Sequence, residues 1–279
     1  HTYHFYTIQY SMIGSHIIKN GTLLPVEEAH LQLDDIAALY GFGVYESLRV
    51  KNGRIFFLEK HIARLLHSAA LIGLEHCFNA GTIQSWCTTL IEKNNTKTAN
   101  IKIIFLGGKE PTIYIFLLAS KFVEKKEYRE GVAVTTFHYE RFLPQAKTLN
   151  MLASYMAYTD AKKQKAFDAL FIDKNNNIIE GSRSNFFAIK GNILYSPPTT
   201  HILAGITREH VIDCAMKNDF IIEEKNILLE DIFNYDGAFL TNTSSKIVPI
   251  RKIDDTSFEK IPEELQRLRT QYNQYLKTI

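Results

Sequence analysis

A dense run of charged residues near the middle of the chain most constrains how it can fold. Residues 121–130 (KFVEKKEYRE) are mostly charged, and they separate two halves that each mix strand-like alternation with helical periodicity. A chain of 279 residues is long enough to build two cores. We therefore predict a two-domain α+β protein, with a small N-terminal domain at 1–120, a linker at 121–130 and a larger C-terminal domain at 131–279.

The first half carries two turn signals and several regular patterns. Asn-Gly pairs at 20–21 and 52–53 predict β-hairpins. Between them, Val44, Glu46 and Leu48 alternate with other residues and predict a strand on which they share one face. The same half is expected to contain helices at 58–70 and 79–93 and strands at 101–106 and 112–119.

The second half predicts a second sheet with helices around it. We expect strands at 132–137, 169–173, 178–187 and 193–196, and helices at 149–164, after 206 and from 262 to the end. Around the first of these helices we expect packing by Leu152, Tyr155, Met156, Tyr158 and Thr159.

Composition excludes several classes of protein. The formal net charge is +2 and no run of eighteen apolar residues occurs, so neither nucleic acid nor a membrane is an expected partner. The first residues lack the pattern of a secretory signal, and we expect a cytoplasmic protein. Cysteines at 77, 87 and 214 lack CxxC spacing, so we expect no metal site.

Three local features could carry chemistry, and each also has an ordinary structural explanation. Lys147, between an apolar strand and a helix, is either a surface charge or a reactive amine. Residues 204–208 (AGITR) open a helix whose free amides suit a phosphate, although Thr207 could simply cap that helix. The hydroxyl-rich segment 241–245 (TNTSS) is either part of a phosphate site or an ordinary turn.

Two charged side chains adjoin apolar patterns. Arg64 lies beside the apolar stripe of its helix, where it could grip a phosphate or extend along the surface. Glu180 ends an apolar strand and is either exposed or paired with a cationic ring nitrogen, since an unpaired buried carboxylate is costly. His61, His67 and His210 lack ligand spacing and are expected to be structural or exposed.

Six motifs in a fixed order extend over nearly the whole chain. They are 41–50 (GFGVYESLRV), 58–65 (LEKHIARL), 147–150 (KTLN), 180–185 (EGSRSN), 203–208 (LAGITR), and LTNTSS at 240–245 followed by IVPI at 247–250. On these motifs the chain resembles the class IV pyridoxal-phosphate aminotransferases of fold type IV. That family includes branched-chain and D-amino-acid transaminases and 4-amino-4-deoxychorismate lyase.

The resemblance implies roles for individual residues. Lys147 matches the lysine that forms a Schiff base with pyridoxal 5'-phosphate, and Glu180 matches the carboxylate that pairs with the pyridine nitrogen. Leu203 matches the residue that packs on the cofactor ring. The residues that match phosphate-binding positions are Arg64, Gly205, Ile206, Thr207, Thr243 and Ser244. The resemblance also implies a cofactor site at the domain interface and a homodimer.

The substrate is left open by departures from the family pattern. Residues 36–38 (IAA) replace the usual Arg-Gly-Tyr/Phe, and the later loop is cut to 107–111 (GGKEP), so the carboxylate-binding residues of D-amino-acid transaminases do not transfer. Arg183, Lys102 and Tyr40 are the candidate replacements, although Lys102 could equally lie at the surface. Transamination and the lyase reaction, which releases pyruvate to give 4-aminobenzoate, both need Lys147 and Glu180. A non-catalytic relative is a third possibility.

Overall fold

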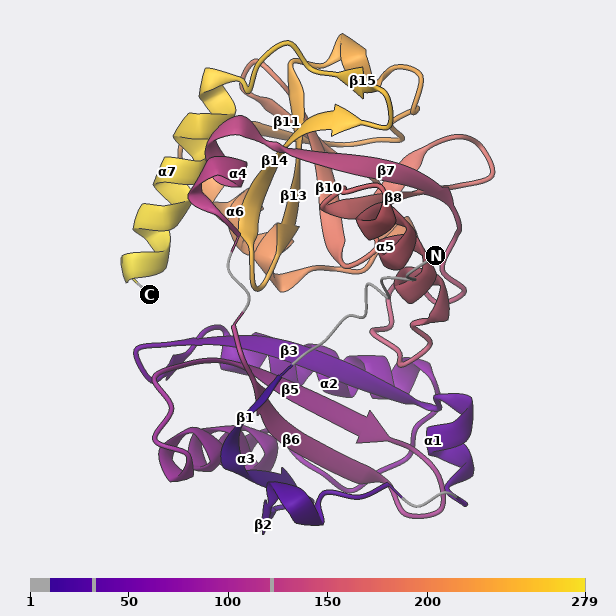
Figure 1. Cartoon of the computed structure of the whole chain (residues 1–279), viewed down its shortest axis with the longest axis vertical. Helices are drawn as coiled ribbons and strands as arrows, with labels where there is room; N and C mark the ends of the chain where they lie inside the picture. Colours follow the sequence, from indigo (N-terminus) through magenta and orange to yellow (C-terminus); the bar gives the residue numbers. More distant parts are fainter. Residues whose placement is uncertain (1–10, 32–33, 121–122, 279) are drawn as a thin grey trace, which may run out of the picture. The chain divides into compact units, whose positions relative to one another are not determined.

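The chain forms two compact units (Figure 1). The computed structural model describes residues 11–31, 34–120 and 123–278. Among these, the N-terminal unit holds the residues up to 120 together with Ala146–Met151, and the C-terminal unit holds the remainder. The predicted α+β class is confirmed, since each unit combines a sheet with helices.

The N-terminal unit is built on one antiparallel sheet with the order β2-β1-β6-β5-β3-β4. Its strands are β1 (Met12–Lys19), β2 (Thr22–Pro25), β3 (Gly43–Lys51), β4 (Arg54–Ile55), β5 (Thr98–Leu106) and β6 (Thr112–Leu118). Both predicted hairpins form, joining β1 to β2 and β3 to β4. Their Asn-Gly turns have positive φ at both positions, which these two residue types tolerate best.

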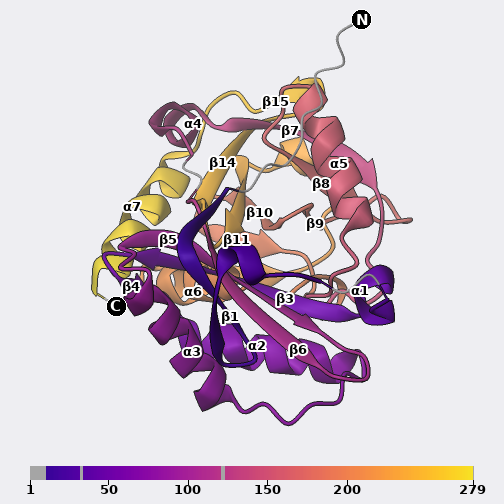
Figure 2. The ribbon, with the colours of Figure 1, turned by 60° about the horizontal axis from the view of Figure 1, so that its bottom comes forward.

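Helices cover one face of this sheet (Figure 2). The helical elements are η1 (Val26–Glu28), α1 (Ile36–Tyr40), α2 (Leu58–Leu71) and α3 (Ala80–Lys93). Apolar side chains of α2 and α3 pack with alternate residues of β3, β5 and β6 to form the core, including Leu48, Leu65 and Ile103. The opposite sheet face carries the residues between them in sequence, among which are Tyr45 and Lys102.

The C-terminal unit contains a closed ring of strands. In the described part of the chain β10, β13, β14, β7, β8 and β9 pair in that order, and β9 pairs back with β10. The strands are β7 (Val132–His138), β8 (Asp168–Ile172), β9 (Ile178–Gly181), β10 (Ser184–Lys190), β11 (Ile193–Ser196), β12 (Ile221–Glu224), β13 (Gly237–Asn242), β14 (Lys246–Ile253) and β15 (Thr256–Ser257). The strand predicted at 178–187 is interrupted by a turn at Ser182 and Arg183, which separates β9 from β10.

Helices surround this ring, with α5 and α7 on opposite sides of it (Figures 1 and 2). The helical elements are α4 (Lys125–Glu130), α5 (Leu152–Lys163), η2 (Thr199–His201), α6 (Ile206–Met216), η3 (Ile232–Asn234) and α7 (Glu263–Thr278). Helix α4 lies within the range predicted as a linker. No helix of the described residues is long and apolar enough to cross a membrane.

The apolar face predicted for the first helix of the second half is wrong. The residues that α5 buries are small, namely Ser154, Ala157 and Ala161, and the two alanines belong to a hydrophobic cluster with β8. Leu152, Tyr155 and Met156 instead lie on its outer side, with exposed fractions of 69%, 44% and 53%. Their i, i+3, i+4 spacing places them on one face, which is an exposed apolar patch in this chain.

Candidate active site

The segment Ala146–Met151 lies on the open edge of β3, in the N-terminal unit. The amide of Tyr45 donates to the carbonyl of Lys147, and the amide of Leu149 donates to the carbonyl of Gly43, both at 2.9 Å. An antiparallel bridge lies between these two bonds. Lys147 therefore belongs to a short extra strand of this sheet.

Two further features hold the backbone of Lys147. Its amide donates to Oγ of Ser68, a buried residue of α2, at 3.1 Å. On β3, a Cβ at Gly43 would lie 2.5 Å from the carbonyl oxygen of Phe105, so only glycine fits where the extra strand joins the sheet. Both polar groups of the Lys147 backbone are thus hydrogen-bonded within one unit.

The side chain of Lys147 shares an aromatic ring with a second lysine. Lys147 Nζ lies 4.5 Å from the ring centroid of Tyr45, and Lys102 Nζ lies 3.5 Å from the same centroid. Lys102 projects from β5, where Ser47 is its partner on β3. The structure thus brings Lys102, a predicted substrate residue, next to Lys147.

Lys102 is unusual for a lysine. Throughout the described ranges, no hydrogen bond or ion pair reaches its Nζ, which lies over the ring of Tyr45. Burial lowers the pKa of Lys102 to about 8, with the charge of Lys147 acting in the same direction, while Tyr45 and Glu46 oppose the shift. A lysine of this kind changes its charge close to neutral pH.

On the helix-covered face of the same sheet lies a buried ionic cluster of Glu46, His61 and Arg64. Glu46 accepts a hydrogen bond from His61 Nδ1 at 2.7 Å and from Arg64 Nε and Nη2 at 2.7 and 2.9 Å. Glu46 and His61 have no exposed surface. His61, Arg64 and Ser68 follow one another along one face of α2, since they are three and four residues apart.

The protonation states in this cluster follow from its geometry. Burial has the largest effect and would raise the pKa of Glu46, but Arg64 and His61 together outweigh it and hold that pKa well below its usual range. Burial also lowers the pKa of His61, and Glu46 opposes this only in part. The ring is therefore neutral at neutral pH and donates Nδ1–H to Glu46. Its Nε2 is buried with no hydrogen-bond partner among the described residues.

In the C-terminal unit, Glu180 is held at the end of β9. Its side chain is almost fully buried, and it accepts hydrogen bonds from the Leu203 amide at 3.2 Å and from Arg141 Nη1 at 3.3 Å. The Leu203 carbonyl accepts a bond of 2.7 Å from Asn185 Nδ2. Glu180 and Leu203, two predicted site residues, are therefore directly linked.

Gly205 and the start of α6 lie beside this link. Gly205 is the N-cap of the helix, and Ile206 and Thr207 form its buried first turn. A Cβ at Gly205 would collide with Oδ1 of Asn185, so the backbone approaches that side chain too closely for any other residue. The first amides of such a helix point outward and favour an anion.

The predicted hydroxyl turn connects β13 to β14. Asn242 Oδ1 accepts bonds from the amides of Ser244 and Ser245 at 3.0 and 2.7 Å, and this leaves Thr243 at the tip. Thr241, at the end of β13, pairs with Asn185 on β10. Its buried hydroxyl oxygen has no hydrogen-bond partner in the part of the chain that the structure describes.

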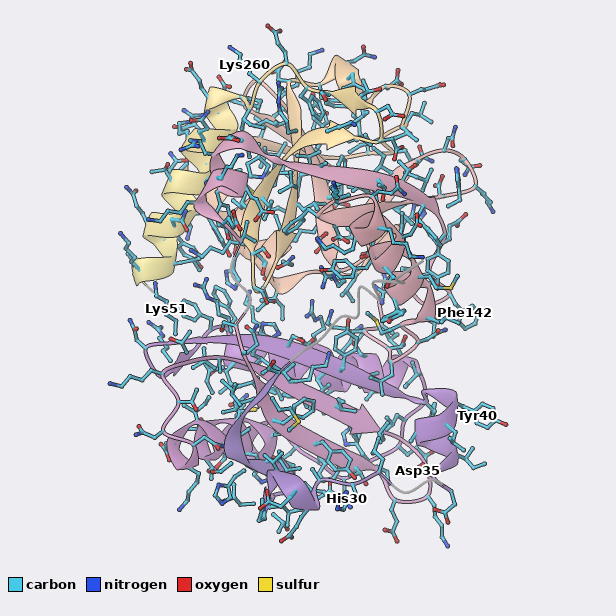
Figure 3. All side chains as sticks on the ribbon, viewed as in Figure 1. His30, Asp35, Tyr40, Lys51, Phe142 and Lys260 are labelled. Atoms are coloured by element: carbon cyan, nitrogen blue, oxygen red, sulfur yellow. The ribbon has the colours of Figure 1, made fainter. Side chains whose placement is uncertain are left out.

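The other two candidate substrate residues lie elsewhere. Tyr40 is 80% exposed, and Figure 3 shows its side chain projecting away from α1. Arg183 belongs to the C-terminal unit, where its guanidinium lies 3.5 Å from the ring centroid of Tyr158. Within the N-terminal unit, Lys102 is the candidate that shares the Tyr45 ring with Lys147.

Sequence reasoning missed Tyr45, Glu46, His61 and Arg141 as site residues. The sequence did contain a signal for Glu46, because it alternates with the apolar residues Val44 and Leu48 on one strand face. A carboxylate buried on such a face requires a partner. No comparable local signal marks Arg141, which lies in the approach to Lys147 and reaches Glu180 across 39 residues of sequence.

Comparisons with known proteins identify relatives of the chain in both sequence and structure. The model of the amino-transferase class IV family matches residues 43–253. A D-alanine aminotransferase of Bacillus licheniformis is 32% identical, over 85% of this chain and 88% of the relative. The structure is similar to a branched-chain aminotransferase of Thermoproteus uzoniensis with norvaline (27% identity, TM-score 0.86, 94% of each chain). It is also similar to a putative 4-amino-4-deoxychorismate lyase of Legionella pneumophila (25% identity, TM-score 0.80, 89% of this chain and 96% of that one).

Proposed function

The chain belongs to the class IV aminotransferases, which use pyridoxal phosphate, and from this premise we propose that it moves an amino group from an amino acid to a 2-oxo acid through a Schiff base at Lys147. The observation that carries this assignment is the Lys147 strand, whose backbone is held at both polar groups and whose amine lies on Tyr45. A nucleophilic amine needs such fixed placement.

The residues present fit the cofactor in chemical type. We propose that Gly205, Ile206, Thr207, Thr243 and Ser244 bind the phosphate, because they combine a helix N-terminus with a hydroxyl turn. The buried Thr241 hydroxyl, which has no hydrogen-bond partner among the described residues, supports this proposal, because it leaves a polar group at this end of β13 for a ligand. Arg64 is the further phosphate candidate, and Glu46 fixes the plane of its guanidinium.

Glu180 and Leu203 complete the proposed cofactor set. Two donors, the Leu203 amide and Arg141, hold the Glu180 carboxylate, which would pair with the cationic ring nitrogen of the cofactor. When bound, pyridoxal phosphate supplies an electron sink for the substrate carbon. Lys147 Nζ would take the proton from that carbon as base and give it back as acid.

For the substrate carboxylate we propose Lys102, with Arg183 and Tyr40 as the remaining candidates. Lys102 is favoured because this half-buried residue lies on the Tyr45 ring beside Lys147, with no counter-ion among the described residues. Similarity to a D-alanine aminotransferase and to a branched-chain aminotransferase leaves both stereochemical classes of amino acid as candidates.

The second candidate function is 4-amino-4-deoxychorismate lyase, favoured by the Legionella structure. Both reactions use Lys147 and Glu180, so a paired assay separates them. Half-transamination of a panel of D- and L-amino acids is measured beside pyruvate release from aminodeoxychorismate. We expect turnover in the amino-acid panel. Pyruvate release without half-transamination would replace the aminotransferase assignment by the lyase.

The working unit that we propose is a cytoplasmic homodimer. The exposed apolar face of α5, formed by Leu152, Tyr155 and Met156, is a surface that a second copy could bury. Replacing all three by serine should shift the mass measured by light scattering from dimer to monomer. A wild-type protein that is monomeric at micromolar concentration would contradict the dimer.

A further inference from the structure

The hydroxyl-rich turn between β13 and β14, residues 243–245, is held from outside by two helices of the C-terminal unit. Tyr128 of α4 donates its hydroxyl proton to the Ser245 carbonyl at 2.8 Å, across 117 residues of sequence. Lys246, which leaves the turn, donates from Nζ to Asn273 Oδ1 of α7 at 2.6 Å. Helices α4 and α7 lie on the same side of the strand ring (Figures 1 and 2). The turn is therefore anchored by groups outside its own hairpin.

The bonds inside the turn fix its shape rather than its position. Asn242 Oδ1 accepts from the amides of Ser244 and Ser245, and Asn242 pairs with Lys246 at the end of the hairpin ladder. All of these atoms belong to the turn and its two flanking residues. Lys246 also has a φ of 62°, a left-handed conformation that a lysine rarely adopts. Beyond the last ladder pair, the turn is tied to the packed body of the unit through Tyr128.

Tyr128 is itself held in a fixed place. Its ring packs against the hydrophobic core of the C-terminal unit, and the guanidinium of Arg269 lies 5.3 Å from the ring centroid. Arg269 and Asn273 are four residues apart and so share one face of α7. At the start of α4, Glu124 and Glu127 form a capping box that fixes the first turn of the helix. A hydroxyl on so constrained a ring can direct the carbonyl that accepts its hydrogen bond.

We propose that Tyr128 is a positioning residue for phosphate binding: through the Ser245 carbonyl, its hydroxyl holds the turn so that Thr243 and Ser244 are in place before the phosphate arrives. This role rests on the proposed function only in taking the turn as part of the phosphate site. Placement of this kind raises affinity, because the ordering of the turn is completed before the ligand binds. It also gives a task to α4, which lies in the segment expected from the sequence to be a linker.

The test isolates the phosphate group by comparing two ligands on the full chain. Dissociation constants are measured for pyridoxal 5'-phosphate and for pyridoxal, which lacks the phosphate, and their ratio gives the contribution of the phosphate. Hydrogen–deuterium exchange of the peptide 240–246 in the cofactor-free chain reports on the turn itself. Tyr128→Phe removes only the hydroxyl. Tyr114→Phe is the matched control, since Tyr114 also donates to a carbonyl, that of His30, at 3.1 Å, and has Lys19 over its ring.

We expect Tyr128→Phe to weaken binding of pyridoxal 5'-phosphate about fivefold, the effect of one lost hydrogen bond, and to leave pyridoxal binding unchanged. Exchange in the peptide 240–246 should become faster, whereas Tyr114→Phe should match the wild type in all three measurements. An unchanged ratio of dissociation constants in Tyr128→Phe overturns the proposal. An equal loss of affinity for both ligands also overturns it, because it would mark a residue that only stabilises the fold.

A double variant, Thr243→Ala with Ser244→Ala, separates this inference from the proposed phosphate site. If the double variant weakens binding of pyridoxal 5'-phosphate alone and Tyr128→Phe does not, the phosphate site stands and the role of Tyr128 is refuted. If the double variant leaves both affinities unchanged, the hydroxyls of the turn do not bind the phosphate, and the inference falls together with this part of the proposed function.

Discussion

The candidate site residues of the two units differ in the kinds of chemical group that they contribute. In the N-terminal unit, Lys147 and Lys102 lie on one sheet face and the Glu46–His61–Arg64 cluster on the other, so this region is rich in titratable side chains. In the C-terminal unit, the region around Glu180 consists mainly of backbone amides, hydroxyls and a glycine. We infer that the first region sets charge and reactivity, whereas the second sets cofactor binding and orientation.

Glu46→Gln should have the largest effect and should act on stability. The substitution removes the charge to which His61 and Arg64 donate, and breaking a buried ion pair costs about 3–5 kcal/mol. Urea unfolding measures the loss. Glu130→Gln, in an exposed ion pair with Arg129, is the control and should leave the unfolding midpoint unchanged. Equal midpoints for the two variants would show that the cluster does not stabilise the fold.

Glu180→Gln should leave the N-terminal region intact and lower kcat by roughly 10²-fold, because an amide cannot hold a proton on the ring nitrogen as a carboxylate does. Single-turnover kinetics gives the rate. Acetylation of Lys147 in the cofactor-free chain serves as the control for the other region and should be unchanged. A variant with wild-type kcat would remove Glu180 from the mechanism.

Gly205→Ala should weaken cofactor binding by about tenfold, since its Cβ displaces Asn185, which holds Leu203. Equilibrium dialysis of pyridoxal phosphate measures the dissociation constant. In Gly81→Ala, a helical glycine of α3, the new Cβ makes only an ordinary contact at 3.6 Å, and affinity should be retained. Similar dissociation constants for both variants would place the phosphate elsewhere.

The smallest expected effect concerns pH. The pKa of His61 is lowered in the fold from its ordinary 6.5, so the unfolded chain binds the extra proton first and stability falls as pH drops below 6.5. Glu46, whose pKa is also lowered, adds a further loss at more acid pH. His61→Asn should flatten the first part of this decline by ~1 kcal/mol between pH 6.5 and 5. His67→Asn, at an exposed position on the same helix, should keep the wild-type dependence of unfolding free energy on pH. If His61→Asn showed that same dependence, His61 would not be the origin of the decline.

Much of the fold could be predicted because its signals are local. The Asn-Gly turns, the stripe of α2 and the ordered motifs were sufficient for the α+β class, the family and a pyridoxal-phosphate aminotransferase, all of which are confirmed. The placement of Ala146–Met151 on β3 could not be predicted, since it depends on hydrogen bonds between residues about a hundred positions apart. The same holds for the ionic cluster, which joins a strand to a later helix, and for the outward face of α5.

The proposed catalysis depends most directly on Lys147 as the attachment point of the cofactor. The holoenzyme is reduced with borohydride, digested and mapped by mass spectrometry, with Lys147→Arg and Lys102→Arg treated in parallel. We predict a phosphopyridoxyl group on the Lys147 peptide of the wild type and of Lys102→Arg, and none in Lys147→Arg. A label on Lys102, or no covalent label in the wild-type protein, would contradict the account.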